Sequence, residues 1–265
     1  MSDFTVMGIV NVTPDSFSDG GWWLDAGAAV AHGRVLSAEG AGILDVGGES
    51  TRPGARAVGA DEELRRVLPV VERLAADGHT VSIDTSKLAV AREALAGGAR
   101  YVNDVTAFRH DPGMAGLVAE AGCECCLMHM RGEPRTMQDD PRYGDVVDDV
   151  RAFLSERAAF AVAEGVPEER IQLDPGIGFG KTTTHNLQLL RRLDEIVALG
   201  FPVVLGTSRK SFLGAITGRE AGERLPGTIA TQVLGLERGA RVFRVHDVGP
   251  VVQALQVAAA TLAAP

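Results

Sequence analysis

Three side chains of this sequence stand where they could hold a small flat ring. Asp84, Asn103 and Asp174 each end a short apolar run, so each would lie at the end of a buried strand, where a charge needs a partner. They offer mainly hydrogen-bond acceptors, with one amide that can also donate. A carboxylate can accept two parallel hydrogen bonds from an aminopyrimidinone edge, so the set suits a heterocycle with an amino group and ring N–H donors. Taken singly, each Asp could instead anchor a loop.

Two basic residues near the end of the chain suggest a second kind of ligand. Arg244 and His246 are two apart in an apolar run, so in an extended strand they face the same side. Together with the amide of Asn11 on the first predicted strand, they could form a phosphate pocket. The alternative is that Arg244 pairs with an internal carboxylate and that His246 is a satisfied core histidine.

The sequence around Asp174 shows why position matters more than any single residue. Residues 173–181 read LDPGIGFGK, and an isolated Asp-Pro-Gly more often caps a turn than binds a ligand. Nearly every other apolar run, however, also stops at a residue able to do chemistry. These residues are Asn11, Glu49, Thr51, Arg52, Asp84, Asn103, His129, Asp174, Ser208, Arg209, Lys210, Arg244 and His246. A fold needs a few such residues for capping, but not one on almost every strand, so we expect a site.

The elements that must position these residues alternate regularly. Eight short β-rich runs, at 6–10, 43–46, 81–83, 101–103, 125–128, 171–173, 203–205 and 242–245, are separated by helix-length segments. Such alternation implies parallel strands joined by right-handed crossovers, and eight units imply closure. The sequence therefore predicts an α/β fold consisting of one (β/α)8 TIM barrel over residues 1–265. Its active site would lie at the C-terminal ends of the strands.

Local patterns support this count. Residues 145–164 carry apolar side chains at helical spacing and predict one of the outer helices. Gly40, Gly98, Gly122 and Gly239 precede predicted strands and fit the left-handed turn that ends a helix. Residues 218–226 are the loosest segment, and we expect a surface loop there. Residues 132–143 are polar and either shape the site or form a plain loop.

Composition limits the classes of function. The 265 residues carry a net charge of −9, which argues against a general nucleic-acid binder. The three cysteines, Cys123, Cys125 and Cys126, crowd into one apolar run and are typical of small buried hydrophobes rather than a zinc site. The sequence shows neither a signal peptide nor an apolar stretch long enough to cross a bilayer, so we expect a cytoplasmic protein without a membrane partner.

Several motifs closely resemble those of the dihydropteroate synthase family. Almost the whole chain is covered, in the family's order, and the two long loops at residues 13–21 and 47–54 carry the most specific motifs. The matching segments are MGIVNVTPDSFSDGG (7–21), DVGGESTRPG (45–54), SIDT (82–85), VND (102–104), DPGIGF (174–179), TSRKSFLG (207–214) and RVHD (244–247). The resemblance implies condensation of 6-hydroxymethyl-7,8-dihydropterin diphosphate with 4-aminobenzoate, giving 7,8-dihydropteroate and diphosphate in folate synthesis.

The resemblance also implies roles for individual residues. The residues implied to be catalytic are Asp84, Asp174, Lys210, Arg244 and His246. Those implied to bind the pterin are Asp84, Asn103, Asp174, Phe179, Lys210 and Arg244. Asn11, Arg244 and His246 would hold the diphosphate, with Asn11 also on Mg2+. The 4-aminobenzoate site, where family members also bind sulfonamides, would comprise Phe17, Thr51, Arg52, Pro53, Phe179, Lys210 and Ser211. A homodimer is also expected, because the family commonly forms one.

Two other functions are compatible with part of this pattern. A pterin-dependent methyltransferase would explain Asp84, Asn103 and Asp174, but not the two loop motifs or the Ser208, Arg209, Lys210 cluster. A non-catalytic pterin-binding paralogue would keep the motifs, and intact motifs alone do not distinguish it from an enzyme.

Overall fold

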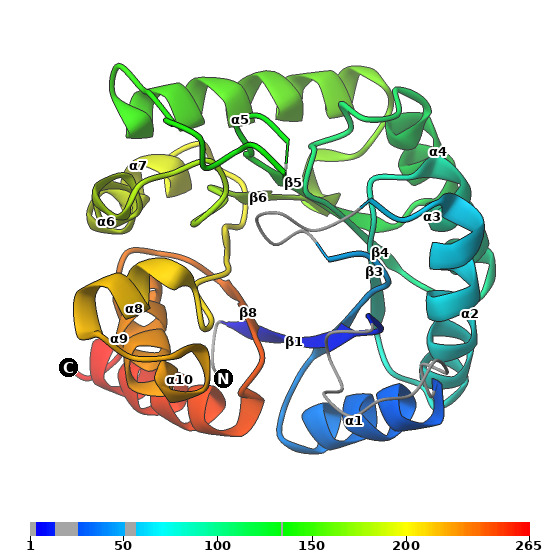
Figure 1. Ribbon diagram of the computed structural model, residues 1–265, viewed down its shortest axis with the longest axis horizontal. Helices are drawn as coiled ribbons and strands as arrows, with labels where there is room; N and C mark the ends of the chain where they lie inside the picture. Colours follow the sequence, from blue (N-terminus) through cyan, green and yellow to red (C-terminus); the bar gives the residue numbers. More distant parts are fainter. Residues whose placement is uncertain (1–3, 14–25, 51–56, 134) are drawn as a thin grey trace.

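Eight parallel strands form the centre of the molecule (Figure 1). The computed structural model describes residues 4–13, 26–50, 57–133 and 135–265. The strands are β1 Thr5–Asn11, β2 Ile43–Gly47, β3 Val81–Asp84, β4 Tyr101–Asp104, β5 Glu124–Met128, β6 Ile171–Asp174, β7 Val204–Leu205 and β8 Val242–Val245. Their order is β6-β5-β4-β3-β2-β1-β8-β7, and a parallel bridge between Leu173 and Val203 joins the two ends. The predicted (β/α)8 barrel is confirmed.

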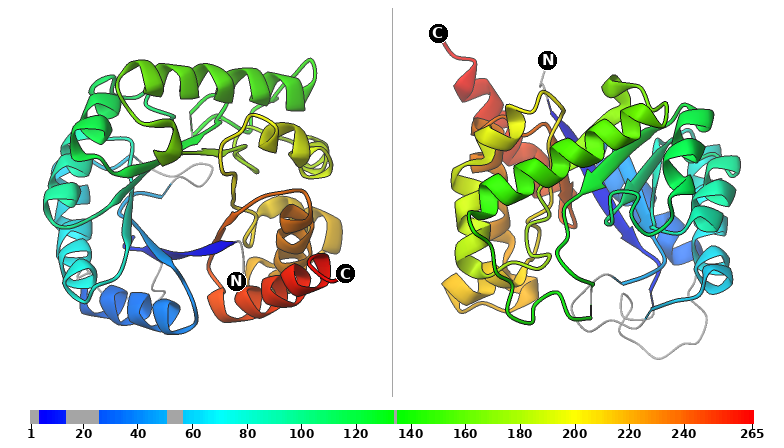
Figure 2. Two further views of the ribbon diagram at one scale, coloured as in Figure 1. Left: turned by 180° about the vertical axis from the view of Figure 1, so that it is seen from behind. Right: turned by 90° about the horizontal axis from the view of Figure 1, so that it is seen from above.

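Helices surround the barrel on its outside, as the two views of Figure 2 show. They are α1 Ala26–Ala38, α2 Ala60–Ala76, α3 Leu88–Ala96, α4 Gly113–Ala121, α5 Val146–Ala163, α6 Thr183–Arg191, α7 Leu193–Val197, α8 Ser211–Thr217, α9 Leu225–Glu237 and α10 Val248–Leu262. The connections after β6 and β7 each contain two helices instead of one. None of the described helices combines the length and the hydrophobicity that crossing a bilayer requires.

Most local predictions are confirmed. Helix α5 occupies the predicted segment, and the Asp145 side chain caps it by accepting from the backbone N–H groups of Val147 and Asp148. The four glycines expected before strands all have positive φ angles, from 60° at Gly122 to 111° at Gly98. The loop predicted over residues 218–226 was wrong at its end, because Leu225 begins α9 with a proline in its first turn.

Alternating side chains divide the strands between two apolar layers. Met7, Ile43, Tyr101, Cys126, Val204 and Val242 are buried inside the barrel and form its floor. Their outward-facing neighbours pack against the helices, as Val6, Val81 and Phe243 do. All three cysteines are buried and unpaired, as their apolar context indicated. The polar strand ends lie above this floor, so the strands hold them in one place.

Candidate active site

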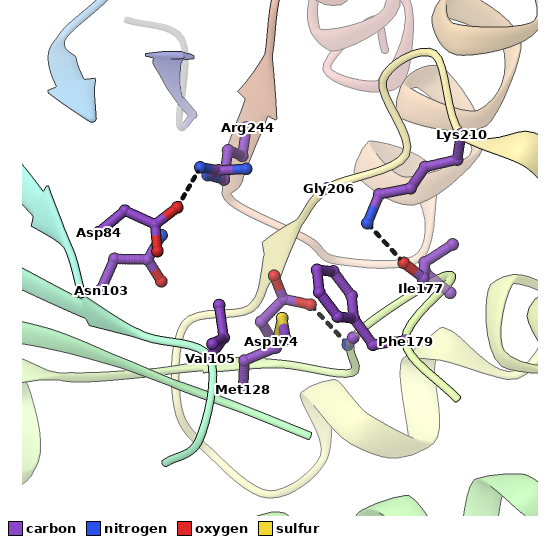
Figure 3. A pocket seen from close by; sticks show the side chains of 11 residues that line it. Asp84, Asn103, Val105, Met128, Asp174, Ile177, Phe179, Gly206, Lys210 and Arg244 are labelled. Atoms are coloured by element: carbon purple, nitrogen blue, oxygen red, sulfur yellow. Dashed lines mark hydrogen bonds and ion pairs between the residues drawn. The ribbon is translucent and has the colours of Figure 1, made fainter. Parts of the chain in front are cut away.

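A pocket opens at the carboxyl ends of the strands, where the sequence predicts a site (Figure 3). It encloses about 340 Å³ of empty space, including open solvent at its mouth. Its lining residues are Asp84, Asn103, Val105, Met128, Asp174, Gly176, Ile177, Phe179, Gly206, Lys210 and Arg244. All six residues expected to bind the pterin are therefore brought together from separate strands and loops. A pocket with an apolar wall and a few convergent polar groups is typical of a small-molecule site.

Arg244 enters the pocket from β8 and is held between two carboxylates. Its Nε donates to Oδ2 of Asp45 at 2.6 Å, and its Nη2 donates to Oδ2 of Asp84 at 2.6 Å. The sequence left open whether Arg244 serves a phosphate or pairs with an internal carboxylate, and the structure shows the pairing. A guanidinium has five N–H groups, so three of them have no partner in the described part of the chain and can bind a ligand.

Asp45 organises the pocket although the sequence patterns did not indicate it as a site residue. It lies within β2, is fully buried, and accepts from Ser82 Oγ at 2.6 Å and from Asn103 Nδ2 at 3.1 Å in addition to Arg244. One carboxylate thus orients both the cation and the amide of the pocket. A signal was present, because an Asp between Leu44 and Val46 in an apolar strand must have a partner.

The surroundings of Asp84 change its ionisation. Burial raises the pKa of Asp84 to about 7, and the nearby negative charges of Asp45, Glu63 and Asp104 act in the same direction, while Arg244 opposes them. Burial alone would lower the pKa of Arg244, but Asp45 and Asp84 outweigh it and raise that pKa. The cluster therefore keeps a permanent cation beside a carboxyl group that titrates near neutrality.

Asp174 ends β6 on the opposite wall of the pocket. Its side chain is 6% exposed, and its Oδ1 accepts the backbone N–H of Gly176 at 2.6 Å. Burial raises the pKa of Asp174, while the Gly176 N–H and the positive charges of Lys210 and Arg244 lower it. No described residue donates a hydrogen bond to Oδ2 of Asp174, so this oxygen can accept from the edge of a heterocycle.

Lys210 directly precedes α8, and its side chain extends into the pocket. Its Nζ donates to the carbonyl oxygen of Ile177 at 2.7 Å and lies 4.1 Å from the centroid of the Phe179 ring. Burial lowers the pKa of Lys210 to about 8, against the opposing charge of Asp174. A cation over an aromatic face is stabilised by the ring quadrupole, so Phe179 and Lys210 support each other.

The residues expected at the diphosphate do not line the pocket together. His246 follows β8, and its Nδ1 shares a hydrogen bond of 2.9 Å with Ser208 Oγ, which also accepts the His246 backbone N–H at 3.1 Å. Asn11 ends β1, and its side chain makes no hydrogen bond to any other described residue. Both residues lie at the ends of strands adjacent to one another, β1 and β8.

His129 is a satisfied core histidine rather than a site residue. Its Nδ1 lies 2.8 Å from Lys181 Nζ, and its ring packs edge-on against Phe153 at 4.9 Å. Burial lowers the pKa of His129 to about 2, with Lys181 adding to the effect, so the ring is neutral. It does not line the pocket, although it follows β5 directly.

Part of the expected aminobenzoate site lies outside the described residues. Phe17, Thr51, Arg52 and Pro53 fall in the segments 14–25 and 51–56. Phe179 and Lys210 line the pocket, and Ser211 begins α8 beside Lys210 as an exposed residue. The described members of the expected set are thus adjacent to the pocket.

The described side chains contain no cluster of the usual metal-binding residues. No group of three His, Cys, Asp or Glu residues in that part of the chain could hold an ion. Mg2+, however, commonly binds through one or two protein ligands together with substrate phosphates and water. The oxygen of the Asn11 amide fits that pattern, because it has no partner within the described structure.

The sequence matches a known protein family over most of its length. The family model described as "Pterin binding enzyme" matches residues 7–246, which include every residue lining the pocket. The barrel and the acceptor-lined pocket define an enzyme of the pterin-binding class.

The individual proteins that the chain resembles are all of one kind within this class. A Mycobacterium leprae dihydropteroate synthase is 50% identical over 264 residues, covering 97% of this chain and 93% of its own. The solved Xanthomonas albilineans dihydropteroate synthase with 4-aminobenzoic acid is 51% identical, with a TM-score of 0.93 over 98% of this chain and 94% of its own. The same enzyme in complex with 7,8-dihydropteroate gives 48% identity and a TM-score of 0.90, over 98% and 94% of the two chains.

The chain belongs to the dihydropteroate synthase family. It is a transferase of folate biosynthesis that condenses 6-hydroxymethyl-7,8-dihydropterin diphosphate with 4-aminobenzoate to 7,8-dihydropteroate and diphosphate. The methyltransferase alternative is therefore set aside.

Proposed function

We propose that the pterin ring binds in the pocket between Asp84, Asn103 and Asp174. The support is their convergence on one opening, together with the solved complex of a similar enzyme with 7,8-dihydropteroate. Asp174 and Asp84 accept hydrogen bonds from the amino group and ring N–H groups, and Asn103 either accepts or donates. Lys210 and Phe179 close the side of the pocket opposite Asp84, as drawn in Figure 3.

The diphosphate is proposed to leave the pterin on the side of Arg244, Asn11 and His246. Within the described residues, three N–H groups of Arg244 remain beyond the two that bind Asp45 and Asp84, and the Asn11 amide has no partner. Fixed donors and a permanent cation stabilise the charge that builds on a departing phosphate oxygen. We assign Arg244 and His246 to catalysis on this basis, and Asp84, Asp174 and Lys210 because they surround the pocket proposed for the ring.

The carboxylates of the pocket serve a second purpose. Loss of diphosphate from the pterin methylene leaves a cation that is delocalised into the ring, and Asp84 and Asp174 lie where they stabilise it. The arylamine then attacks as a neutral nucleophile, so no strong general base is required. Exclusion of water protects the cation from hydrolysis.

Mg2+ is proposed to bind with the substrate rather than to the free protein. Asn11 would contribute its amide oxygen, and the diphosphate would contribute most of the remaining ligands. When bound, the ion supplies Lewis-acid stabilisation of the leaving group.

The 4-aminobenzoate site is proposed beside the pterin, at Phe179, Lys210 and Ser211. The complex of the Xanthomonas albilineans enzyme with 4-aminobenzoic acid supports an aminobenzoate site in this fold. Phe17, Thr51, Arg52 and Pro53 complete the proposed site from the two loops outside the described residues. Replacing Arg52 or Phe17 by Ala should weaken use of aminobenzoate and leave binding of pterin diphosphate largely intact.

We further propose one barrel domain over residues 1–265, cytoplasmic and paired as a homodimer. Support for pairing comes from large apolar side chains exposed on the adjacent outer helices α6, α8 and α9, namely Leu187, Ile216 and Leu234. The molecular mass in sedimentation over a range of concentrations tests the dimer.

The test of the activity is diphosphate release from the pterin substrate, with and without 4-aminobenzoate and with Mg2+ chelated. We expect release coupled one to one with dihydropteroate and slowed strongly by chelation. Binding of pterin diphosphate without release in the complete mixture would instead identify a non-catalytic paralogue.

A further inference from the structure

The loop after β6 is held almost entirely by side chains. Residues 176–180 contain three glycines with positive φ, at 66°, 83° and 63°, and lie between β6 and α6. Each of the five successive carbonyl oxygens accepts a hydrogen bond from a side chain. The donors are Lys181 for Gly176 and Phe179, Lys210 for Ile177, Gln138 for Gly178 and Tyr143 for Gly180. Glycine has the greatest backbone freedom, so these bonds determine the shape of the loop.

Lys181 holds two of the five carbonyls and is itself buried. Its side chain is 3% exposed and turns back into the loop, where Nζ donates to Gly176 O at 2.9 Å and to Phe179 O at 3.0 Å. Nζ also lies 2.8 Å from His129 Nδ1. Burial lowers the pKa of Lys181, yet a neutral amine still has two N–H donors for the two carbonyls.

The pocket depends on the shape of this loop. Phe179 lines the pocket and supports Lys210 from within the loop. Asp174 lies on β6, where the sheet fixes its backbone through the bond from the His129 N–H to its carbonyl oxygen, and only its Oδ1 contacts the loop, at the Gly176 N–H. A Cβ at Gly178 would lie 3.1 Å from Lys210 Cδ, so the loop also packs closely on Lys210. Movement of the loop would therefore displace Phe179 and Lys210 more than Asp174.

We propose that Lys181 is a positioning residue for the reaction, which fixes Phe179 and Lys210 through the carbonyls of Gly176 and Phe179 and thereby sets the affinity for the arylamine substrate. This inference rests on the proposed assignment of Phe179 and Lys210 to the aminobenzoate site. Residues 132–143 contribute to the same arrangement through Gln138 and Tyr143, so this segment shapes the site.

The test replaces Lys181 by Met, which keeps an unbranched side chain as far as Cε and removes the donating amine. We expect the KM for 4-aminobenzoate to rise roughly tenfold, because small displacements of positioning groups are costly. Binding of pterin diphosphate, measured by calorimetry, should weaken by a clearly smaller factor than the rise in this KM, since Asp84, Asn103 and the backbone of Asp174 are held by strands rather than by the loop. Hydrogen exchange of the peptide over residues 175–182 should become faster in Lys181→Met.

Two further variants keep the test decisive. Tyr143→Phe removes the hydroxyl that donates to the Gly180 carbonyl oxygen, and it should raise the KM for 4-aminobenzoate by a smaller factor than Lys181→Met. This variant keeps the test possible if Lys181→Met does not fold. Leu154→Ala, in the buried face of α5, is the control for loss of stability alone and should leave both constants unchanged. A KM for aminobenzoate that is unchanged in both loop variants, or raised equally in Leu154→Ala, would overturn the inference.

Phe179→Ala separates this inference from the proposed site. A raised KM in Phe179→Ala with wild-type behaviour in Lys181→Met rejects the role of Lys181 and leaves the site assignment intact. Unchanged kinetics in Phe179→Ala reject the site assignment itself, and the role of Lys181 with it.

Discussion

Arg244 and Asp45 are joined by a hydrogen bond of 2.6 Å although 199 positions separate them in the chain. The same oxygen of Asp45 accepts from Asn103, so one buried carboxylate fixes the direction of two pocket side chains. Charge-assisted bonds of this kind are strong and directional. The geometry of the proposed pterin pocket therefore depends on Asp45, a buried residue of β2.

Replacing Asp45 by Asn should lower kcat/KM for pterin diphosphate by about 10- to 100-fold, because Arg244 and Asn103 lose a common anchor. The free energy of unfolding should fall by about 3 kcal/mol, since the change breaks a buried ion pair. Ser82→Ala, which removes the donor to the other oxygen of Asp45, serves as the control and should cost about 1 kcal/mol with a small kinetic effect. Wild-type kinetics in Asp45→Asn would show that Arg244 needs no such anchor.

The pH dependence of activity should reflect Lys210. Its pKa is lowered to about 8, so the ammonium is lost as pH rises through that value, and kcat/KM should decline there. Asp84, with a pKa raised to about 7, becomes charged as pH rises through 7 and should define the acid limb. In Lys210→Arg the cation persists, and the alkaline limb should disappear. An alkaline limb at the same pH in both enzymes would assign it to the substrate.

Gly176 should not tolerate a side chain. Its φ is 66°, and a Cβ would lie 1.9 Å from the His129 carbonyl oxygen. Gly176→Ala should therefore reduce the free energy of unfolding by more than about 2 kcal/mol, from strain and the clash together. Gly116→Ala is the matched control, because it lies exposed in α4 with nothing within 4 Å, and it should stabilise by roughly 0.5–1 kcal/mol. Chemical denaturation of both variants provides the comparison.

Mg2+ should bind measurably only when diphosphate is present. Calorimetry with Mg2+ alone should show no tight site, and adding the ion should tighten binding of pterin diphosphate. Asn11→Ala should reduce that gain and leave metal-free binding nearly unchanged. Tight binding of Mg2+ to the free protein would contradict the proposed assignment.

The strands and the ring of strand-end residues could be predicted because they depend on local patterns. Apolar runs ending in Asp84 and Asp174 specify both the barrel and the carboxylates at its mouth. The partner of Arg244 could not be predicted, since Asp45 and Asp84 are brought to it only by closure of the barrel. The proposed role of Lys181 could not be predicted either, because it depends on a side chain that turns back into the preceding loop.

Binding of pterin diphosphate to Asp174→Asn and to the wild type, measured side by side by calorimetry, tests the central claim most directly. The amide keeps the size of the side chain but replaces an acceptor by a donor that would face the donor edge of the ring. We expect at least about a 100-fold loss of affinity with an unchanged fold by circular dichroism. Equal affinity in the two proteins would show that the pterin does not bind at the strand ends.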